Sequence, residues 1–459
     1  MAKIFTIKDS KVARWSVLLL TSVTLFAAYF FTDVLSPLED VLLKLRHWDG
    51  DQYGFFAGQY SFLNIIGFMI IGGAILDKLG IRKTGLWFIL LMLVGASIKY
   101  YALTDYFNNG GFGYAFFNSF WVNYQPSVKL ASLGFMIFGL GSEVAGITLT
   151  KVVVKWFNGK ELAMAMGLQV AISRLGTGAA FVLAPRLASR MSLSAPIVFG
   201  IVLLAIGLVA FLIHSGFDMK LDKQQTNADG EVTEEVFRWS DLPKVMANRG
   251  FVYISMLCVL FYSCVFPFMK FATNLMINKY GVNSELAGLI VFVLPFGTVL
   301  LTPLFGWVID KKGKGATMMI LGSVLLVLVH LLFAFLPGNV YLALLGMFLL
   351  GIAFSLVPSA LWPAVPKIVP EQYLGSAYAM IFWVQNIGLW IFPILIGSVR
   401  EWSNPGVSAA IQQGSSVTFD YTMPMLMLVL VGVVAILFAI FLKQADAKRG
   451  YGLELPSGE

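Results

Sequence analysis

The sequence alternates between apolar blocks of roughly 20 residues and short polar segments. A helix needs about 20 apolar residues to cross the ~30 Å hydrocarbon core of a bilayer. We therefore expect an all-α membrane protein. The pattern predicts twelve transmembrane helices, which lie at about 14–36, 53–76, 84–103, 128–151, 161–185, 193–214, 250–274, 285–309, 316–336, 340–365, 372–398 and 421–443.

The longest polar interval divides these spans into two sets of six. We predict an N-terminal six-helix bundle, a linker, a C-terminal six-helix bundle and a tail, over residues 1–214, 215–249, 250–443 and 444–459. An even number of spans places both termini on one side. Lysine and arginine are concentrated in the N-terminal segment and in the short loops of that side. Cytoplasmic loops carry such an excess, so we expect both termini, the linker and the tail in the cytoplasm.

Composition excludes several classes of function. The chain is 58% hydrophobic and 12% charged, whereas about a quarter of the residues of a soluble domain are charged. The net charge of +7 reflects the basic loops, so a nucleic-acid partner is not expected. There is no His/Cys cluster for a metal and no G-x-x-x-x-G-K-[S/T] phosphate loop for ATP. We expect a transporter without cofactor or enzymatic activity.

A short basic segment occurs once in each half. GAILDKLGIRK follows the second span and GWVIDKKGKG follows the eighth, and the two aspartates are 233 residues apart. Recurrence at the same place in each half is expected of a duplicated six-helix unit. The glycines permit sharp turns and close helix contacts, and the aspartates can pair with basic residues or a helix N-terminus. We predict a conformational role, or a purely helix-terminating one, for Gly73, Asp77, Gly80, Arg82, Gly306, Asp310 and Gly313.

The first copy resembles the loop signature G-x-x-x-D-x-x-G-x-R-K of the major facilitator superfamily, and the second resembles a degraded copy. Two copies, each after the second helix of a six-span half, extend the resemblance to the whole chain. The resemblance implies a carrier whose halves rock about a central site that opens alternately to each side.

Two charges lie deep inside apolar spans. Glu143 is eight residues before Lys151 and Arg174 is thirteen residues after Glu161, so both are expected near the bilayer midplane. A charge at a helix centre costs about 2.5–3.5 kcal/mol even on a lenient scale, and such residues face cavities or pair with one another. One interpretation is a structural Glu143–Arg174 ion pair. The other is that the two charges bind opposite ends of a zwitterion, and pair with each other when the site is empty.

Four stretches spread over both halves carry a closer resemblance: KELAMAMGLQVAISRLGT, YFFTD, FPFMK and LWPAVPKIVPEQYLGSAYAMIFWVQNIG. They are similar to the family of major facilitator superfamily domain-containing protein 1. This family includes a lysosomal dipeptide uniporter. The resemblance implies transport of short peptides whose charged termini contact Glu143 and Arg174.

Other polar or aromatic side chains within spans are weaker candidates. Substrate contact competes with gating or solvation for Asp33, with snorkelling for Lys270, and with helix-helix hydrogen bonding or lipid packing for the others. The set is Tyr29, Asp33, Gln59, Tyr60, Asn64, Gln169, Lys270, Trp362, Trp383 and Asn386.

Three functions remain open. The first is a short-peptide carrier, by facilitated transport or proton symport. The second is a proton-coupled carrier of a small organic anion or amino acid, and the third is a non-transporting sensor or accessory subunit. We expect a monomer, with an accessory subunit as an alternative. No N-x-[S/T] sequon occurs, so we favour a bacterial inner membrane over a lysosomal one.

Overall fold

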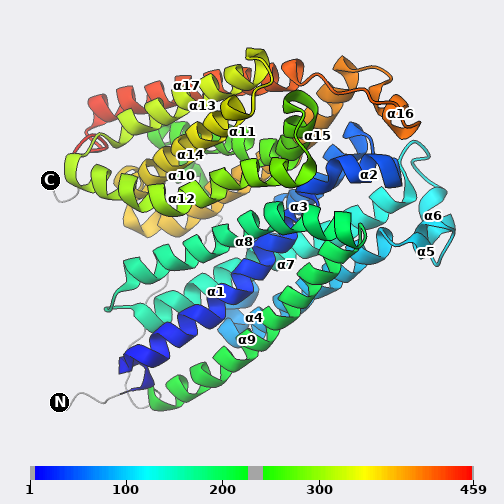
Figure 1. Cartoon of the computed structure of the whole chain (residues 1–459). Coiled ribbons are helices and arrows are strands. Elements are labelled where there is room, and N and C mark those ends of the chain that lie inside the picture. The colour runs from blue at the N-terminus through cyan, green and yellow to red at the C-terminus, as the bar shows by residue number, and fades with distance from the viewer. Residues whose placement is uncertain (1–5, 226–240, 457–459) are drawn as a thin grey trace, which may run out of the picture.

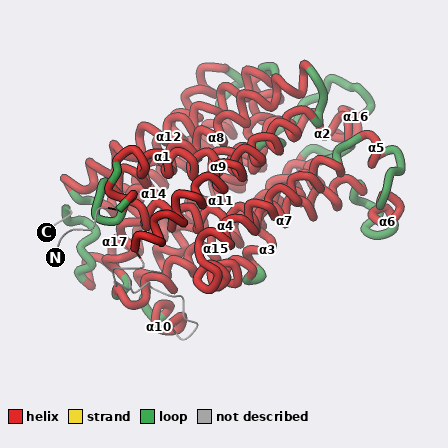
Figure 2. Tube along the Cα trace, turned by 90° about the horizontal axis from the view of Figure 1, so that it is seen from below, coloured by secondary structure: helices red, strands yellow, loops and turns green. Residues whose placement is uncertain are grey.

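The computed structural model describes residues 6–225 and 241–456, and side chains are described throughout except at residues 163 and 225. Within these ranges the secondary structure is helical, and Figure 2 shows helices joined by loops with no strand among the described residues. The predicted all-α class is confirmed.

The first half contains nine helices in the described residues. They are α1 (Lys11–Asp33), α2 (Glu39–Arg46), α3 (Gly50–Ile65), α4 (Phe68–Ala102), α5 (Asp105–Asn108), α6 (Tyr114–Asn118), α7 (Pro126–Phe157), α8 (Leu162–Arg190) and α9 (Ala195–Gln225). The second half contains α10 (Leu242–Met246), α11 (Arg249–Tyr280), α12 (Ser284–Lys312), α13 (Gly315–Phe335), α14 (Val340–Ile368), α15 (Leu374–Ser403), α16 (Val407–Gln412) and α17 (Thr422–Arg449).

Helix α4 is two helices joined by a tight turn. Gly80 inside it has φ +76° and ψ 173°, which is not helical. The Thr84 hydroxyl donates to the carbonyl of Ile75 at 3.4 Å, whereas nine residues of continuous helix would separate them by about 13 Å. The chain therefore reverses at Gly80. The second predicted span consists of α3 and the first part of α4, and the third span is the rest of α4. With the two parts of α4 counted as one, the described residues contain eleven helical segments that are long and apolar enough to span a membrane.

Two predicted boundaries differ from the helices. Helix α9 continues to Gln225, well into the predicted linker, and residues 226–240 of that linker lie outside the described residues. At the other end, α17 continues to Arg449, so the predicted tail begins as helix. Its next residues pack on the C-terminal half, where the backbone N–H groups of Lys314 and Gly315 donate to the carbonyls of Glu454 and Leu453.

Side-chain caps define several helix ends. The side chains of Ser10, Asp49 and Asn283 accept backbone N–H groups at the starts of α1, α3 and α12, as expected of N-cap residues. Gly281, with φ +63°, ends α11 in a left-handed conformation that suits glycine. The membrane-spanning helices are apolar in their interiors, and capping residues next to them in the sequence determine where they begin and end.

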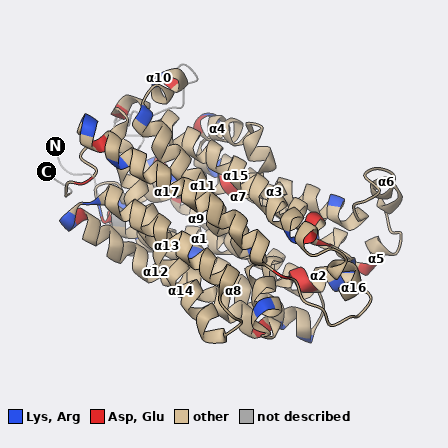
Figure 3. Cartoon of the chain, turned by 90° about the horizontal axis from the view of Figure 1, so that it is seen from above, with Lys and Arg blue, Asp and Glu red and all other residues tan. Residues whose placement is uncertain are grey.

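The two halves lie side by side and both termini lie at the same end of the bundle (Figure 1). We call this end the terminal side, and the opposite end, with α2, α5, α6 and α16, the far side. Charged residues gather toward the two ends, and most of the helical ribbon between them carries no Lys, Arg, Asp or Glu (Figure 3). This distribution suits a bundle whose middle lies in hydrocarbon.

The halves contact each other mainly toward the far side. Helix α3 packs on α15, and α8 packs on α12. On the far-side parts of α8 and α12, Phe181 and Val291 are fully buried. On their terminal-side parts, Met164 and Leu304 are exposed.

Candidate substrate-binding and gating site

The guanidinium of Arg174 lies among aromatic rings that come from both halves. Its central carbon is 5.7 Å from the ring centroid of Tyr29 on α1, and 5.2 Å from the centroids of both Phe266 on α11 and Phe354 on α14. Cation–π contacts of this length stabilise a guanidinium weakly and leave its N–H groups free to donate. Among the described residues, Arg174 has neither an ion-pair partner nor a hydrogen-bond acceptor. It is a cation held in place by rings and available to an anion.

Glu143, on the adjacent helix α7, is also without a cationic partner among the described residues. The hydroxyl of Tyr60 on α3 donates to its Oε1 at 2.9 Å. One turn further along α3, Asn64 is buried, and neither its amide nitrogen nor its amide oxygen has a hydrogen-bond partner. Buried polar groups without partners are rare in native proteins and each calls for an explanation, such as a ligand or water. This side of the site carries an acceptor, a hydroxyl and a free amide.

The expected pairing of the two charges is absent from this conformation. No ion pair joins Glu143 to Arg174 in the described part of the chain. The structural Glu143–Arg174 ion pair is therefore not formed in this structure, and the binding of a zwitterion by the two charges stays a prediction. The physical reason lies in their surroundings, because Tyr60 holds the carboxylate while the three rings hold the guanidinium.

Asp33 and Lys270 form an ion pair between the halves. Asp33 is the last residue of α1, and its Oδ1 is 2.6 Å from the Nζ of Lys270 on α11. The Thr177 hydroxyl of α8 donates to the other carboxylate oxygen at 2.9 Å, and Lys270 also donates to the carbonyl of Thr32 at 3.1 Å. Neither side chain is more than 13% exposed. The pair closes the far side at the level of the end of α1, so Lys270 does not snorkel to the interface.

A second ionic cluster, further toward the far side, was missed from the sequence. Arg400 on α15 is fully buried and binds Glu39, whose helix α2 belongs to the other half. The Arg400 Nη1 also donates to the hydroxyl of Tyr421 at 3.1 Å and to Oδ1 of Asn274 at 3.4 Å. Its Nη2 contacts Glu401 at 3.2 Å. Both acidic partners and the arginine lie near the ends of apolar blocks, where charges are normally solvated, so the sequence carried no signal of burial.

A glycine stripe on α3 forms the seam with α15. Gly50, Gly54 and Gly58 are spaced four apart on one helix face, and a Cβ on Gly54 or Gly58 would lie 2.4 Å from the carbonyl oxygen of Pro393 or Trp390. No real Cβ tolerates that distance from backbone. Small residues at this spacing let two membrane helices approach closely. The two backbones therefore touch along the seam, and larger side chains would force them apart.

The remaining predicted candidates make hydrogen bonds or ring contacts within the protein, and their contact with substrate stays a prediction. Gln59 donates to the carbonyl of Phe55 on its own helix, Gln169 donates to Leu149, and Asn386 donates to Phe382. Trp383 donates to the carbonyl of Ile65 across the halves at 2.7 Å.

Trp362 donates to the Tyr262 hydroxyl at 3.0 Å and stacks on Phe382 with 5.0 Å between centroids. Trp362 belongs to the aromatic wall that continues from Phe266 and Phe354, since Tyr262 contacts both.

The loop-signature residues lie at the terminal side. Asp77 pairs with Lys151 of α7 at 3.2 Å, and Arg82 pairs with Asp222 of α9 at 3.0 Å, all within the N-terminal half. In the second copy, Gly313 has φ +68° and ends α12 beside Asp310, where the chain segment around Glu454 covers the turn.

The glycines of the signature play different parts. Gly80 and Gly313 adopt positive φ, as sharp turns require. A Cβ on Gly73 or Gly306 would meet nothing within 4 Å, so the close helix contact expected at these two glycines is absent here. The open space at both positions agrees with contact between the halves being concentrated toward the far side.

The start of α1 is tied to the α7–α8 turn at the terminal side. Arg14 pairs with Glu161 at 3.1 Å, and Lys160 pairs with Asp9. The hydrogen bond from Lys160 holds the pKa of the Asp9 carboxyl well below its usual range. These contacts join elements of the same half, so they leave the halves free to separate on this side.

Lys99, on the second part of α4, is a fully buried cation that the sequence analysis did not select. Its Nζ donates to the carbonyl of Phe31 at 3.2 Å and lies 4.1 Å from the ring centroid of Phe31 and 4.5 Å from that of Phe135. No carboxylate of the described residues pairs with it. Lys270 lies 6.0 Å from the Phe135 centroid. Lys99 and Lys270 both donate to carbonyls of the last turn of α1, those of Phe31 and Thr32. Carbonyls at the C-terminal end of a helix attract cations.

Comparison with known proteins gives consistent results. The family model described as Major Facilitator Superfamily matches residues 21–393 and 271–455. The chain is 29% identical over 387 residues to the lysosomal dipeptide transporter MFSD1 of Danio rerio, covering 82% of this chain and 78% of that protein. It is 28% identical over 399 residues to MFSD1 of Homo sapiens, covering 84% and 80%.

Solved structures share the fold at low sequence identity. The bacterial homologue of the human lysosomal transporter Spinster, in an inward-facing and unoccupied conformation, superimposes with a TM-score of 0.71 at 14% identity, covering 96% of this chain and 98% of that one. The nucleoside transporter NupG gives 0.70 at 15% identity, covering 93% and 99%.

Proposed function

Because the chain belongs to the major facilitator superfamily, it is a multi-pass membrane transporter, and we propose that it carries dipeptides whose termini are held by Arg174 and Glu143. The relatives named as lysosomal dipeptide transporters support this substrate class. The observation that carries the proposal is that Arg174 and Glu143 lie on adjacent helices without neutralising each other. Two opposite charges kept apart in an apolar bundle suit a zwitterionic guest.

Arg174 is proposed to bind the peptide carboxylate. A guanidinium presents a planar fork that matches a carboxylate with two parallel hydrogen bonds. The rings of Tyr29, Phe266 and Phe354 fix the fork in position and use none of its donors. Since two of these rings belong to the C-terminal half, a substrate at Arg174 would contact both halves at once.

Glu143 is proposed to accept the peptide ammonium. Tyr60 orients the carboxylate through its hydroxyl. The free amide of Asn64, one turn away on the same face of α3, offers both a donor and an acceptor to the peptide bond or to water bound with it. Because only the charged termini of the peptide are bound by charge, the peptide side chains would lie against aromatic rings. This arrangement suits dipeptides with many different side chains.

Access to this site is proposed to alternate by rocking of the halves. The Asp33–Lys270 and Glu39–Arg400 pairs and the glycine seam hold the far side closed. Opening of the far side would break them, and contacts at the terminal side, around Gly73 and Gly306, would form in exchange. The basic loops at the terminal side support its assignment to the cytoplasm. We place the protein in a bacterial inner membrane, or in a lysosomal membrane in a eukaryotic host.

Counterflow in proteoliposomes tests the proposal. Vesicles loaded with an unlabelled neutral dipeptide such as leucyl-alanine should accumulate the labelled dipeptide transiently, and Arg174→Ala vesicles should not. Free leucine and succinate should fail to drive the exchange. Exchange of succinate or leucine in place of the dipeptide would favour the alternative, a carrier of small anions or amino acids. Binding without exchange would indicate a sensor.

A further inference from the structure

The hairpin between α4 and α7, residues 103–125, is aromatic and almost free of charge. No Asp, Glu, Lys or Arg occurs between Tyr106 and Val128. Its exposed side chains include Phe112, Phe116, Trp121 and Val122. Soluble surfaces rarely expose a contiguous apolar patch of this kind, and such patches mark interaction or membrane sites.

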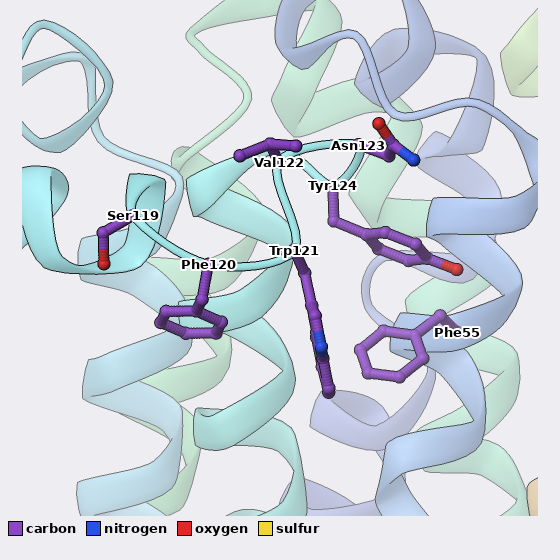
Figure 4. Close-up of a pocket in the computed structure, with 7 residues that line it drawn as sticks. All are labelled: Phe55, Ser119, Phe120, Trp121, Val122, Asn123 and Tyr124. Carbon is purple, nitrogen blue, oxygen red and sulfur yellow. The ribbon is translucent and has the colours of Figure 1, made fainter.

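The hairpin and α3 border an open cavity of about 500 Å³. Its walls are Phe55 of α3 and the hairpin residues from Ser119 to Tyr124 (Figure 4). The ring of Trp121 meets Phe55 edge-on at 6.0 Å, and Tyr124 lies 5.2 Å from Phe55 on another side. In Figure 4 the rings of Phe120 and Trp121 point away from the hairpin and along the helices, toward the membrane-spanning part of the bundle.

The backbone conformation and hydrogen bonds of the hairpin hold these rings in place. Trp121 adopts φ +44°, a left-handed conformation that bulky residues rarely adopt. Its carbonyl accepts the backbone N–H of Tyr124 at 2.8 Å and the ammonium of Lys129 at 3.3 Å, and Lys129 also binds the carbonyl of Phe120. Strained backbone persists only where the surroundings enforce it, and it tends to mark functional positions.

Depth places the cavity in the lipid interface. Helix α7 has 32 residues, about 48 Å at 1.5 Å per residue, whereas the hydrocarbon core is ~30 Å thick. The excess places the first turns of α7, and the hairpin before them, at the headgroup level. Trp and Tyr concentrate there because their rings are apolar and their N–H or O–H groups are polar.

From these observations we propose that the cavity binds one acyl chain of a phospholipid in the far-side leaflet, with the Trp121 indole at the level of the ester groups. The cavity walls contain no free charged group, and Lys129 is occupied by two carbonyls. Binding is therefore indifferent to headgroup charge. The lipid touches Phe55, whose neighbour Gly54 forms the seam with α15, so it contacts the helix that closes the far side.

Fluorine NMR of the full chain labelled with 5-fluorotryptophan in nanodiscs tests the location. The Trp121 resonance is assigned by its loss in Trp121→Phe, and the fully buried Trp48 serves as reference. A nitroxide on the upper acyl chain should broaden the Trp121 resonance, an aqueous gadolinium chelate should not, and neither should affect Trp48. Broadening by the chelate alone would place the hairpin in water, and protection from both probes would indicate a protein cover; either overturns the proposal.

Native mass spectrometry tests the binding itself. Protein extracted from phosphatidylcholine nanodiscs should retain a lipid that Trp121→Ser loses by about tenfold, while Tyr106→Ser, on the same hairpin but outside the cavity, retains it. Phosphatidylglycerol should give the same occupancy. Equal retention by both variants, or retention of the anionic lipid alone, would contradict the proposal.

Discussion

The Nζ of Lys270 lies 2.6 Å from Oδ1 of Asp33 and joins the last residue of α1 to the far-side part of α11 across the two halves. The two residues are 237 positions apart in the chain. The pair can exist only while the far side is closed, because the separating halves carry one member each. It therefore reports the conformation of the carrier directly.

Neutralising either member of this pair should open the far side. A fully buried pair that loses one partner costs 3–5 kcal/mol, and partial exposure reduces this to about 1–3 kcal/mol, or roughly five- to 150-fold in the population of the closed state. Spin labels at the exposed positions Leu45 and Trp402 measure the far-side distance. Lys270→Met should lengthen it, and Asp33→Lys combined with Lys270→Asp should restore it. An unchanged distance in Lys270→Met would show that the Asp33–Lys270 pair does not hold the far side closed.

Adding a methyl group at the seam should have the same direction of effect. Gly54→Ala places a Cβ 2.4 Å from the Pro393 carbonyl oxygen, and overpacking of this kind costs about 1–3 kcal/mol. We expect the far-side distance to lengthen and thermal stability to fall. Gly73→Ala is the matched control, since nothing lies within 4 Å of its Cβ. Equal behaviour of the two variants would show that the seam can relax.

Removing the Tyr60 hydroxyl should weaken dipeptide binding modestly. The Tyr60→Phe variant loses one hydrogen bond to Glu143, worth about 0.5–1.5 kcal/mol, or roughly two- to tenfold in affinity. Calorimetric titration with leucyl-alanine measures the change. Tyr101→Phe, whose hydroxyl contacts only the far-side hairpin, should bind normally. A loss of affinity in both variants would point to a general structural effect.

Replacing Lys99 should show whether this buried lysine stabilises the fold, in contrast to Lys270, which holds the far side closed. Lys99 is fully buried without a carboxylate, and replacing a desolvated charge with an apolar side chain of similar size is often neutral or stabilising by 1 kcal/mol or more. Lys99→Met should therefore unfold at the same or a higher temperature in detergent. Lys99→Glu, which faces the carbonyl of Phe31, should be strongly destabilised. A large loss of stability in Lys99→Met would show that its bond to α1 outweighs its desolvation.

The features that could be predicted from the sequence are those that depend on the local pattern of residues. Apolar block length predicted the helices, and the charges of Glu143 and Arg174 were visible because each interrupts an apolar run. Asp33 and Lys270 were both predicted as candidates, but their pairing depends on tertiary distance that no local pattern encodes.

The missed features lack a local signal. Arg400 lies at the end of an apolar block, where an arginine is usually solvated, and its burial depends on α2 of the other half. The glycine stripe of α3 was hidden because the chain has 44 glycines, and only the approach of α15 gives three of them a role. The separation of Glu143 from Arg174 follows from Tyr60 and the aromatic rings, which reach the site from other helices.

A binding titration that crosses substitutions with blocked substrates shows whether Arg174 and Glu143 hold opposite termini of one dipeptide. Leucyl-alanine, its C-terminal amide and its N-acetyl form are each titrated against the wild-type protein, Arg174→Ala and Glu143→Gln. Each block should weaken wild-type binding about tenfold or more. Amidation should have no further effect in Arg174→Ala, and acetylation should have none in Glu143→Gln. Equal penalties for both blocks in all three proteins would show that the two charges do not hold the peptide termini.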